Sequence, residues 1–370
     1  MPFSYDNNKL LATSIAKGAS HIADECSPMQ IGYFERNDSY RFSAAFVRVA
    51  ETTAWSWQQS CMAQWIKNGS DDLICFNDIV EGKHVTRIRD VARKKDVSII
   101  KLPLYNITSD GKWGVSINFS RLARFRPGYG YSKPSIPPDN FRSCSADGLA
   151  IVNIPSGRTE LIVSFDELGK DREWQDDQYL NHAQFSPDGK FVAFFHIGGG
   201  EREKQVRFML IDRSTNNVAV IEEGRRVSHY CWLSNDMILA TVKKSHSPSD
   251  WQYCRYKIAD DLSVAREQCA LPLETDGHPM QCPIRPGVIV TDQRANRFGV
   301  DRIILAHLAT SQVLRLGYFL LPPNFRGPLR CDLHPRWDRV GEEVCVDCML
   351  GQQRRIAVIR LHANEQLVSH

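Results

Sequence analysis

A turn followed by an apolar strand recurs seven times along this 370-residue chain. The clearest copy is NHAQFSPDGKFVAFFH at 181–196, where Pro187, Asp188 and Gly189 separate two apolar runs. Such residues suit turns because they tolerate or preset the backbone angles that a reversal needs. The anchor positions of the seven turns are Ser39, Asp72, Gly111, Gly189, Asp236, Gly287 and Gly341, with spacings of 33, 39, 78, 47, 51 and 54 residues. A period of this length predicts one supersecondary unit that is repeated along the chain.

A second pattern alternates with the first: an apolar run, a polar turn and another apolar run. It is clear at 149–163, 206–221, 253–268, 302–316 and 355–368, and weaker at 46–55 and 85–100. The runs are short and rich in Val, Ile, Phe and Tyr, which favours strands over helices. Two hairpins in each of seven repeats predict an all-β fold, a seven-bladed β-propeller of four-stranded blades. We expect residues 1–370 to form this propeller as a single domain.

Charge and composition limit the possible partners. The formal net charge of +3 is too small to predict binding to nucleic acid or to a membrane surface. No apolar run approaches the roughly 18 residues of a membrane span, and LLATSIA at 10–16 lacks the basic flank of a secretory signal. We therefore expect a cytoplasmic protein whose 11 cysteines are reduced thiols.

Four histidines occupy the same register in successive repeats: His182, His229, His278 and His334. The first strand of each blade lines the channel of a propeller, so these side chains are expected to converge near the axis. Each histidine could instead cap its own strand, an interpretation that suffices for any one of them but not for four in register. Neutral imidazoles suit Zn, Mn, Fe, Ni or Cu, which predicts a divalent metal. Asp332 in RCDLHPRW could add an oxygen ligand or could simply be a turn residue.

The spacing of 78 residues contains an insertion at about 121–143, between the second and third strands of its blade. A long loop stiffened by proline on a binding face is usually functional. Arginine binds carboxylates through two N–H groups at once, and tyrosine adds stacking and a titratable hydroxyl. The candidates for ligand contact are Arg121, Arg126, Tyr129 and Tyr131 in the insertion, and Arg207 and Arg336 outside it.

The segment WSWQQSC at 55–61 is dense in aromatic and amide side chains. Trp57 and Gln58 could reach the same end of the channel as the insertion. Buried packing of the two tryptophans, Trp55 and Trp57, is the preferred interpretation.

The blade starts NHAQFSPDGK, VSHYCWLSND, DGHPMQCPIRPG and DLHPRWDRVG resemble those of the oligogalacturonate lyases, propellers of the TolB and WD40-like type. The resemblance covers the last four blades, roughly half of the chain. It implies a cytoplasmic enzyme that binds manganese through histidines and a glutamine and cleaves short uronic-acid oligomers by β-elimination. Where that family carries His-Pro-His, this chain has Asp332-Leu333-His334, so the metal shell would differ.

The resemblance also implies roles for the candidate residues. The metal ligands would be His229, His278 and His334, with Asp332 as a further ligand. The ion would be Mn²⁺, with Zn²⁺ or another divalent metal as alternatives. The catalytic groups would be His182 as base or further ligand, Tyr129 as acid, and Arg121 and Arg126 as carboxylate clamps. The acidic oligosaccharide or polysaccharide would also contact Arg207, Arg336, Trp57, Gln58 and Tyr131.

Two other functions stay open at this point. WSWQQSCMAQW and SINFSRLARFRPGYGY resemble segments of uncharacterised bacterial propellers associated with surface polysaccharides. The chain could therefore be a non-catalytic module that binds a glycan or a protein in polysaccharide assembly, since propellers host many functions. A glycoside hydrolase would need two carboxylates about 5–9 Å apart, and the channel-end positions offer no convincing pair.

Overall fold

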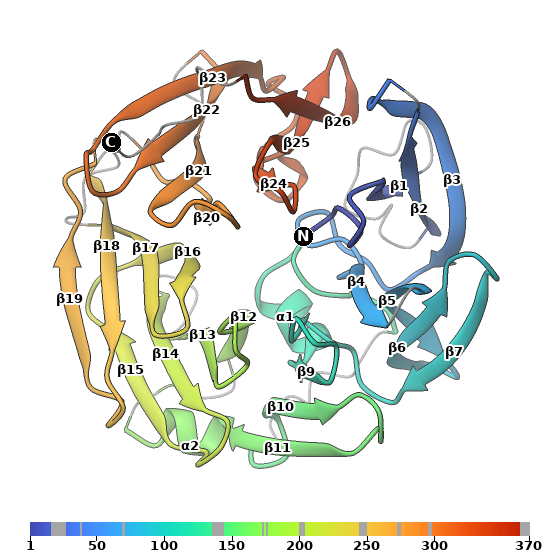
Figure 1. Ribbon diagram of the computed structural model, residues 1–370. Helices are drawn as coiled ribbons and strands as arrows, with labels where there is room; N and C mark the ends of the chain where they lie inside the picture. The colour runs from blue at the N-terminus through green and yellow to red at the C-terminus, as the bar shows by residue number, and fades with distance from the viewer. Residues whose placement is uncertain are drawn as a thin grey trace. The chain divides into compact units, whose positions relative to one another are not determined.

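The computed structural model describes residues 1–15, 27–37, 39–68, 71–134, 144–171, 174, 177–199, 204–243, 250–271, 275–294 and 298–362. These residues form seven antiparallel sheets that follow one another along the chain (Figure 1). Five sheets have four strands and two have three. The chain is thus an all-β, seven-bladed β-propeller, as the repeats predict.

Within each sheet, strands that are neighbours in sequence pair with each other. The first three sheets contain β1 (Lys9–Ser14), β2 (Met29–Arg36) and β3 (Phe42–Thr52); β4 (Gln64–Asn68), β5 (Asp71–Val80), β6 (Lys83–Asp90) and β7 (Lys95–Ile100); and β8 (Asn106–Ile107), β9 (Trp113–Ser116), β10 (Gly148–Asn153) and β11 (Thr159–Ser164). The fourth contains β12 (Tyr179–Phe185), β13 (Phe191–Gly198), β14 (Gln205–Asp212) and β15 (Val218–Glu222).

The last three sheets follow the same order. They contain β16 (Val227–Ser234), β17 (Met237–Lys243), β18 (Trp251–Ile258) and β19 (Val264–Gln268); β20 (Met280–Gln281), β21 (Val288–Gln293), β22 (Val300–His307) and β23 (Val313–Leu320); and β24 (Arg336–Trp337), β25 (Glu343–Leu350) and β26 (Gln353–Arg360). The chain divides into two compact units, Pro2–Val218 and Met1 with Ala219–His370. That 1–370 is a single domain stays a prediction.

Five of the seven turn anchors lie between the first and second strands of their sheets, and Asp72 is the second residue of the second strand, β5. Gly189 and Gly341 have φ angles of 74° and 68°, which favour glycine because a Cβ would be strained there. Each glycine also packs closely: a Cβ on Gly341 would lie 2.8 Å from Cys282 Sγ, and one on Gly189 would lie 2.9 Å from Thr108 Cγ2. Gly189 and Gly341 therefore serve both the turn and the contact with the preceding blade.

The first repeat departs from the prediction. Ser39 lies between β2 and β3, one connection later in its sheet than the other anchors. The weak hairpin at 46–55 is wrong as well, since β3 runs without a break from Phe42 to Thr52. The exposed residues of β3 are Ala44, Ala45, Arg48 and Glu51, so the strand has no continuous apolar pattern that the sequence could reveal. In the last hairpin, β26 forms the first run, whereas residues 363–368 lie outside the described part of the chain.

The core lies between neighbouring sheets. In the unit Pro2–Val218, one cluster joins Cys75, Ile88 and Val152 from the second and third sheets. In the other unit, Val290 and Val346 pack in a cluster that includes the fully buried Trp337. Each such apolar side chain contributes about 1.5–3 kcal/mol through burial. Blade-to-blade packing of apolar side chains thus holds the strands that carry the polar sites.

The predicted insertion lies between β9 and β10, and residues 135–143 of it are outside the described part of the chain. It begins with a short helix, α1 (Phe119–Phe125), that the sequence pattern did not predict. Seven residues are too few to reveal a 3.6-residue period. Asn118 caps α1 by accepting a hydrogen bond from the backbone N–H of Arg121 at 2.9 Å. A second short helix, α2 (Phe165–Gly169), follows β11, and a 3₁₀ turn occupies Gly327–Leu329.

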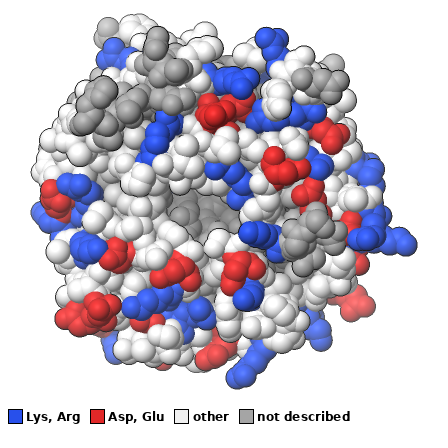
Figure 2. All heavy atoms as spheres, viewed as in Figure 1, with Lys and Arg blue, Asp and Glu red and all other residues white. Residues whose placement is uncertain are grey.

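The surface carries charges of both signs. Figure 2 shows basic and acidic side chains interspersed over the face in view, with no broad region of one sign. Of the helices that the structure describes, none is long and apolar enough to cross a membrane. The ten described cysteines are all buried, and no disulfide joins any two of them.

Candidate metal centre

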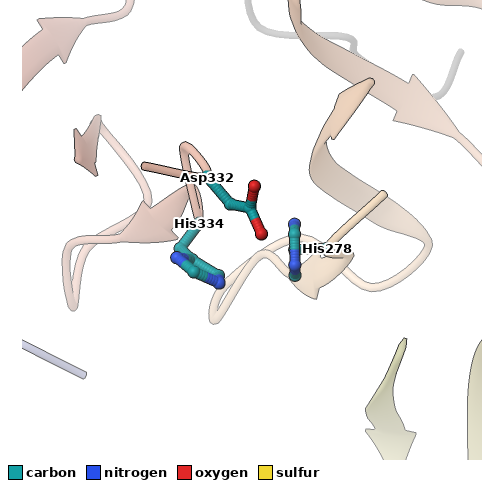
Figure 3. Close-up of side chains that lie close together, drawn as sticks. All are labelled: His278, Asp332 and His334. Atoms are coloured by element: carbon teal, nitrogen blue, oxygen red, sulfur yellow. The ribbon is translucent and has the colours of Figure 1, made fainter. Parts of the chain in front are cut away.

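Three side chains bring metal-binding atoms together in the unit that contains Ala219–His370. The ligand atoms of His278, Asp332 and His334 all lie within 4.8 Å of one another. His278 precedes β20, and the other two residues precede β24 in the next sheet. Figure 3 shows the Asp332 carboxylate extending between the two imidazole rings. Two imidazoles and a carboxylate are a donor set that binds divalent transition metals.

His278 is held by a carboxylate on the neighbouring strand. Its Nδ1 lies 2.9 Å from both carboxylate oxygens of Asp292 on β21, and its backbone N–H donates to the same side chain at 2.7 Å. With the proton on Nδ1, the lone pair of Nε2 is available to a metal. That Nε2 is buried and has no hydrogen-bond partner among the described residues. A bound cation would satisfy it, so the residues present fit a metal ion.

His334 shares the same carboxylate. Its backbone N–H donates to Asp292 Oδ2 at 3.3 Å, so one aspartate positions both histidines. Its ring centroid lies 4.3 Å from that of His278. Burial and the nearby His278 lower the pKa of His334 to about 3. At neutral pH this imidazole is therefore uncharged, the form that coordinates metals.

His229 on β16 borders the same group. Its ring centroid lies 3.9 Å from that of His278, and its Nδ1 lies 3.2 Å from Asp276 Oδ1. Burial and His278 lower the pKa of His229 to about 4. For His278 itself, burial lowers the pKa, but Asp292 and other carboxylates outweigh that effect and raise it. Three of the four predicted histidines are thus in ring contact, and we call them, with Asp332 and Asp292, the histidine–carboxylate cluster.

Two arginines accompany the carboxylate of Asp332. Arg330 donates from Nε to Asp332 Oδ2 at 2.7 Å, and an Nη of Arg294 lies 3.7 Å from the same oxygen. Arg294 also lies 3.6 Å from Asp276 Oδ2. Although burial raises the pKa of Asp332, Arg294 and the neighbouring histidines lower it below the ordinary value. Asp332 is therefore ionised, as a metal ligand must be.

The aspartates that contact the histidines, Asp292 and Asp347, were not predicted from the sequence, although the repeat contains a signal for them. In five repeats a polar residue interrupts or ends the apolar second strand at one register. These residues are Asn77, Ser116, Thr241, Asp292 and Asp347, each five residues after its anchor except Asp347, which follows by six. Asp292 supports His278, and Asp347 lies 3.9 Å from His334 Nδ1. A polar side chain that recurs within buried strands indicates a partner on the adjacent strand.

His182 belongs to the other unit, Pro2–Val218. It lies on β12 with a φ of 51°, where the pairing with β13 has a bulge. Its ring packs edge-on against Phe195 at 5.3 Å, and its backbone N–H donates to Tyr105 Oη at 3.1 Å. Polar contacts near it join amides and hydroxyls: Gln59 Nε2 contacts Tyr105 Oη at 2.6 Å and Asn181 Oδ1 at 2.8 Å. A joint role of His182 with the other histidines stays a prediction.

The predicted ligand-binding residues of the insertion are largely buried. Arg121 is fully buried, with its guanidinium bonded to Asp147 at 2.7 Å and to the carbonyl of Gln178 at 3.1 Å. In this arrangement Arg121 supports the insertion, whereas a carboxylate clamp needs a guanidinium that a ligand can reach. Arg126 is half-buried and lies 3.8 Å over the ring of Tyr129, which is itself buried.

Tyr131 is also buried. Its hydroxyl accepts a hydrogen bond from Asn77 Nδ2 at 2.8 Å, and its ring stacks on Phe119 at 4.3 Å. Burial raises the pKa of Tyr131 well above the ordinary value. We call Gln59, Asn77, Tyr105, Tyr131 and Asn181 the amide–hydroxyl network.

The remaining predicted residues have protein partners. Arg336 forms two hydrogen bonds with Asp347, at 2.7 and 2.8 Å. Arg207 is buried and donates to the Leu168 carbonyl at 2.8 Å. Trp57 is buried against Trp55, with ring centroids 5.3 Å apart, which agrees with the packing interpretation. Gln58 is half-buried, and its backbone N–H donates to Gly128 in the insertion at 3.0 Å.

Several solved structures have a fold similar to that of this chain. An oligogalacturonate lyase from Vibrio parahaemolyticus matches with a TM-score of 0.65 and 15% identity, over 98% of this chain and 89% of that chain. An oligogalacturonate lyase in complex with manganese matches with a TM-score of 0.62 and 13% identity, over 98% and 88%. The tricorn protease matches with a TM-score of 0.54 and 9% identity, over 95% of this chain and 36% of its own.

At these identities the similarity shows the fold alone. A scan against family models finds none that matches the chain, and a search of curated proteins finds no similar sequence. The resemblance of the blade starts to oligogalacturonate lyases is thus confirmed at the level of structure.

Proposed function

We propose that this propeller is a metal-dependent lyase that cleaves uronic-acid-containing oligosaccharides by β-elimination. The observation that carries the proposal is the grouping of His278, Asp332 and His334, whose ligand atoms lie within 4.8 Å of one another. The orphaned Nε2 of His278 and its carboxylate support on Nδ1 are the features expected of a metal ligand. The similarity to lyases, one of them in complex with manganese, supports Mn²⁺ as the ion.

In β-elimination a base takes the proton from the carbon that bears the carboxylate, and the carbon–oxygen bond at the next carbon breaks. A double bond forms between these two carbons, and the departing oxygen gains a proton. The proton is hard to remove because the carbanion left behind is unstable. A divalent cation, when bound, supplies Lewis acidity that stabilises the charge developing on the substrate carboxylate. The protein must also provide a base whose pKa suits the working pH, and histidine is the usual choice.

The side chains of this unit would hold and tune the ion. His278 and His334 would donate imidazole nitrogen, Asp332 a carboxylate oxygen, and Asp292 would keep both imidazoles oriented. Arg294 offers a cationic group beside Asp332 that could pair with a substrate carboxylate. His182 is the base predicted from sequence, and a His182→Ala variant that keeps its metal but loses turnover would support that role.

A spectrophotometric assay tests the proposal. The protein is incubated with uronate-containing oligosaccharides and Mn²⁺, and the ultraviolet absorbance of the new conjugated double bond is followed. We expect a steady increase with the wild type and none with His334→Ala. His307→Ala serves as the matched control, since His307 lies in the same unit and bonds to Thr310 instead. Bound Mn²⁺ without any absorbance change across a broad panel of uronates would reject the lyase and favour a glycan-binding module.

A further inference from the structure

A second polar site lies on the fifth sheet. A cavity of about 270 Å³ is lined by Arg225, Gln252, Arg266 and Gln268. It is larger than an inorganic ion needs, and its size fits a compact organic molecule.

Strand pairing explains why these side chains meet. Gln252 lies on β18, and Arg266 and Gln268 lie on β19. Tyr256 of β18 is paired with Arg266, so these two side chains share a face of the sheet. Alternate residues of a strand also share a face, so Gln252 lies on that same face, together with Arg266 and Gln268. Arg225 comes from the segment between β15 and β16. The cavity is therefore built on the outer pair of strands of one blade.

The charges around the cavity do not balance. Nη atoms of Arg225 and Arg266 lie 3.8 and 3.6 Å from one oxygen of Glu222, longer than a hydrogen bond. That oxygen already accepts a hydrogen bond from Tyr256 Oη at 2.9 Å. Among the residues that the structure describes, one carboxylate thus faces two guanidinium groups, which leaves a net positive charge and planar N–H donors that are not fully used. Such donors bind carboxylates in pairs.

Gln252 adds a neutral polar group. It is 8% exposed, and its Oε1 is buried with no hydrogen-bond partner in the part of the chain that the structure describes. A buried amide that lacks a partner costs free energy unless a ligand or water supplies one. Gln268 offers a second amide, exposed at the same cavity.

We propose that this cavity binds a compact organic anion with a carboxylate beside hydroxyl groups, the chemistry of an acidic sugar residue. Arg225 and Arg266 would bind the carboxylate, and the amides of Gln252 and Gln268 would bind the hydroxyls. The cavity shares no lining residue with the histidine–carboxylate cluster, so this inference does not rest on the proposed lyase activity. An enzyme or a binding module could each use such a site to hold a second part of an acidic glycan.

Calorimetric titration of the full chain with galacturonate tests the proposal. We expect binding to the wild type and a loss of about 10–100-fold in affinity in Arg266→Gln and in Arg225→Gln, the range for a hydrogen bond to a charged group. Arg255→Gln is the matched control, because Arg255 is on β18 but pairs with Glu267 at 2.7 Å on the opposite face. Its affinity should equal that of the wild type. His334→Ala should also bind normally, which separates this site from the metal centre.

Two competing ligands complete the experiment. Galactose, which has the hydroxyls without the carboxylate, should bind at least tenfold more weakly than galacturonate. Inorganic phosphate should also bind more weakly, because it cannot reach the two amides at once. Equal affinity of Arg266→Gln and wild type for galacturonate, or tighter binding of galactose or phosphate than of galacturonate, would overturn the proposal.

Discussion

The histidine–carboxylate cluster and the amide–hydroxyl network contain residues at the same register of the repeat but differ in charge. Asp292 on β21 and Asn77 on β5 each follow their turn anchor by five residues, and both are buried. Asp292 bonds to the imidazole of His278, whereas Asn77 bonds to Thr86, Leu104 and Tyr131. An ionised carboxylate can support a cation, while a neutral amide with all of its bonds satisfied only strengthens the fold. One position in the repeat would thus serve the proposed metal centre in one unit and stability in the other.

The largest effect is expected from Asn77→Ala. Its side chain forms four hydrogen bonds in a fully buried position, and its removal leaves the hydroxyl of Thr86 and the amide of Leu104 with fewer partners. We expect the free energy of unfolding to fall by about 3 kcal/mol, from lost bonds and unpaired buried groups. Urea unfolding measures the change. The affinity for Mn²⁺ should stay the same. A marked fall in this affinity would show that Asn77 supports metal binding as well as stability, contrary to the comparison.

The corresponding substitution in the histidine–carboxylate cluster is Asp292→Asn. It keeps the shape of the side chain but removes the charge that orients His278 and His334, so Mn²⁺ affinity should fall about 10–100-fold. Calorimetric titration with Mn²⁺ measures this, with Asp261→Asn in the exposed β18–β19 turn as the control. Stability should change less than in Asn77→Ala. If Asp292→Asn unfolds the protein and leaves the affinity of the folded fraction intact, Asp292 is a structural residue like Asn77.

Arg330→Gln is expected to raise the affinity for Mn²⁺, by a smaller factor than that by which Asp292→Asn lowers it. Arg330 donates to Asp332 at 2.7 Å and places a positive charge beside a ligand of the proposed metal. Its removal should raise Mn²⁺ affinity about threefold to tenfold, because like charges near a partly buried site repel. Arg315→Gln on the exposed strand β23 controls for the overall change in net charge. A lower affinity in Arg330→Gln would instead mean that this arginine positions Asp332 for binding.

The sequence defines the architecture and part of the proposed centre. Seven turn anchors and alternating hairpins predict the sheets because turn chemistry and strand periodicity are local properties. The register of His278 and His334 predicts their convergence once the propeller is recognised. Asp292 was missed because it sits within a run, VIVTDQ, that otherwise indicates a buried strand. The ion pair of Arg121 with Asp147 joins residues 26 positions apart and depends on how the insertion folds back, which no local pattern encodes.

The smallest effect concerns His84, which lies edge-on to Tyr131 of the amide–hydroxyl network at 5.3 Å. Burial lowers its pKa below the ordinary 6.5. Through His84 the unfolded chain therefore binds more protons than the folded chain near pH 6.5. As the pH drops from 7.5 to 5.5, this residue alone should lower the free energy of unfolding by less than about 1.4 kcal/mol per pH unit, in addition to the losses from His229 and His334, whose pKa values are also lowered. Urea unfolding at the two pH values should show a smaller loss for His84→Phe than for the wild type. An equal loss of stability in the two proteins would mean that a group other than His84 causes it.

The most direct measurement is the metal content of the protein after equilibrium dialysis against Mn²⁺. We expect one ion per chain in the wild type and in the control His307→Ala, and essentially none in His278→Ala or His334→Ala. Each variant is first shown to be folded by circular dichroism. If His278→Ala and His334→Ala both keep one ion with wild-type affinity, the cluster of His278, Asp332 and His334 does not hold the metal.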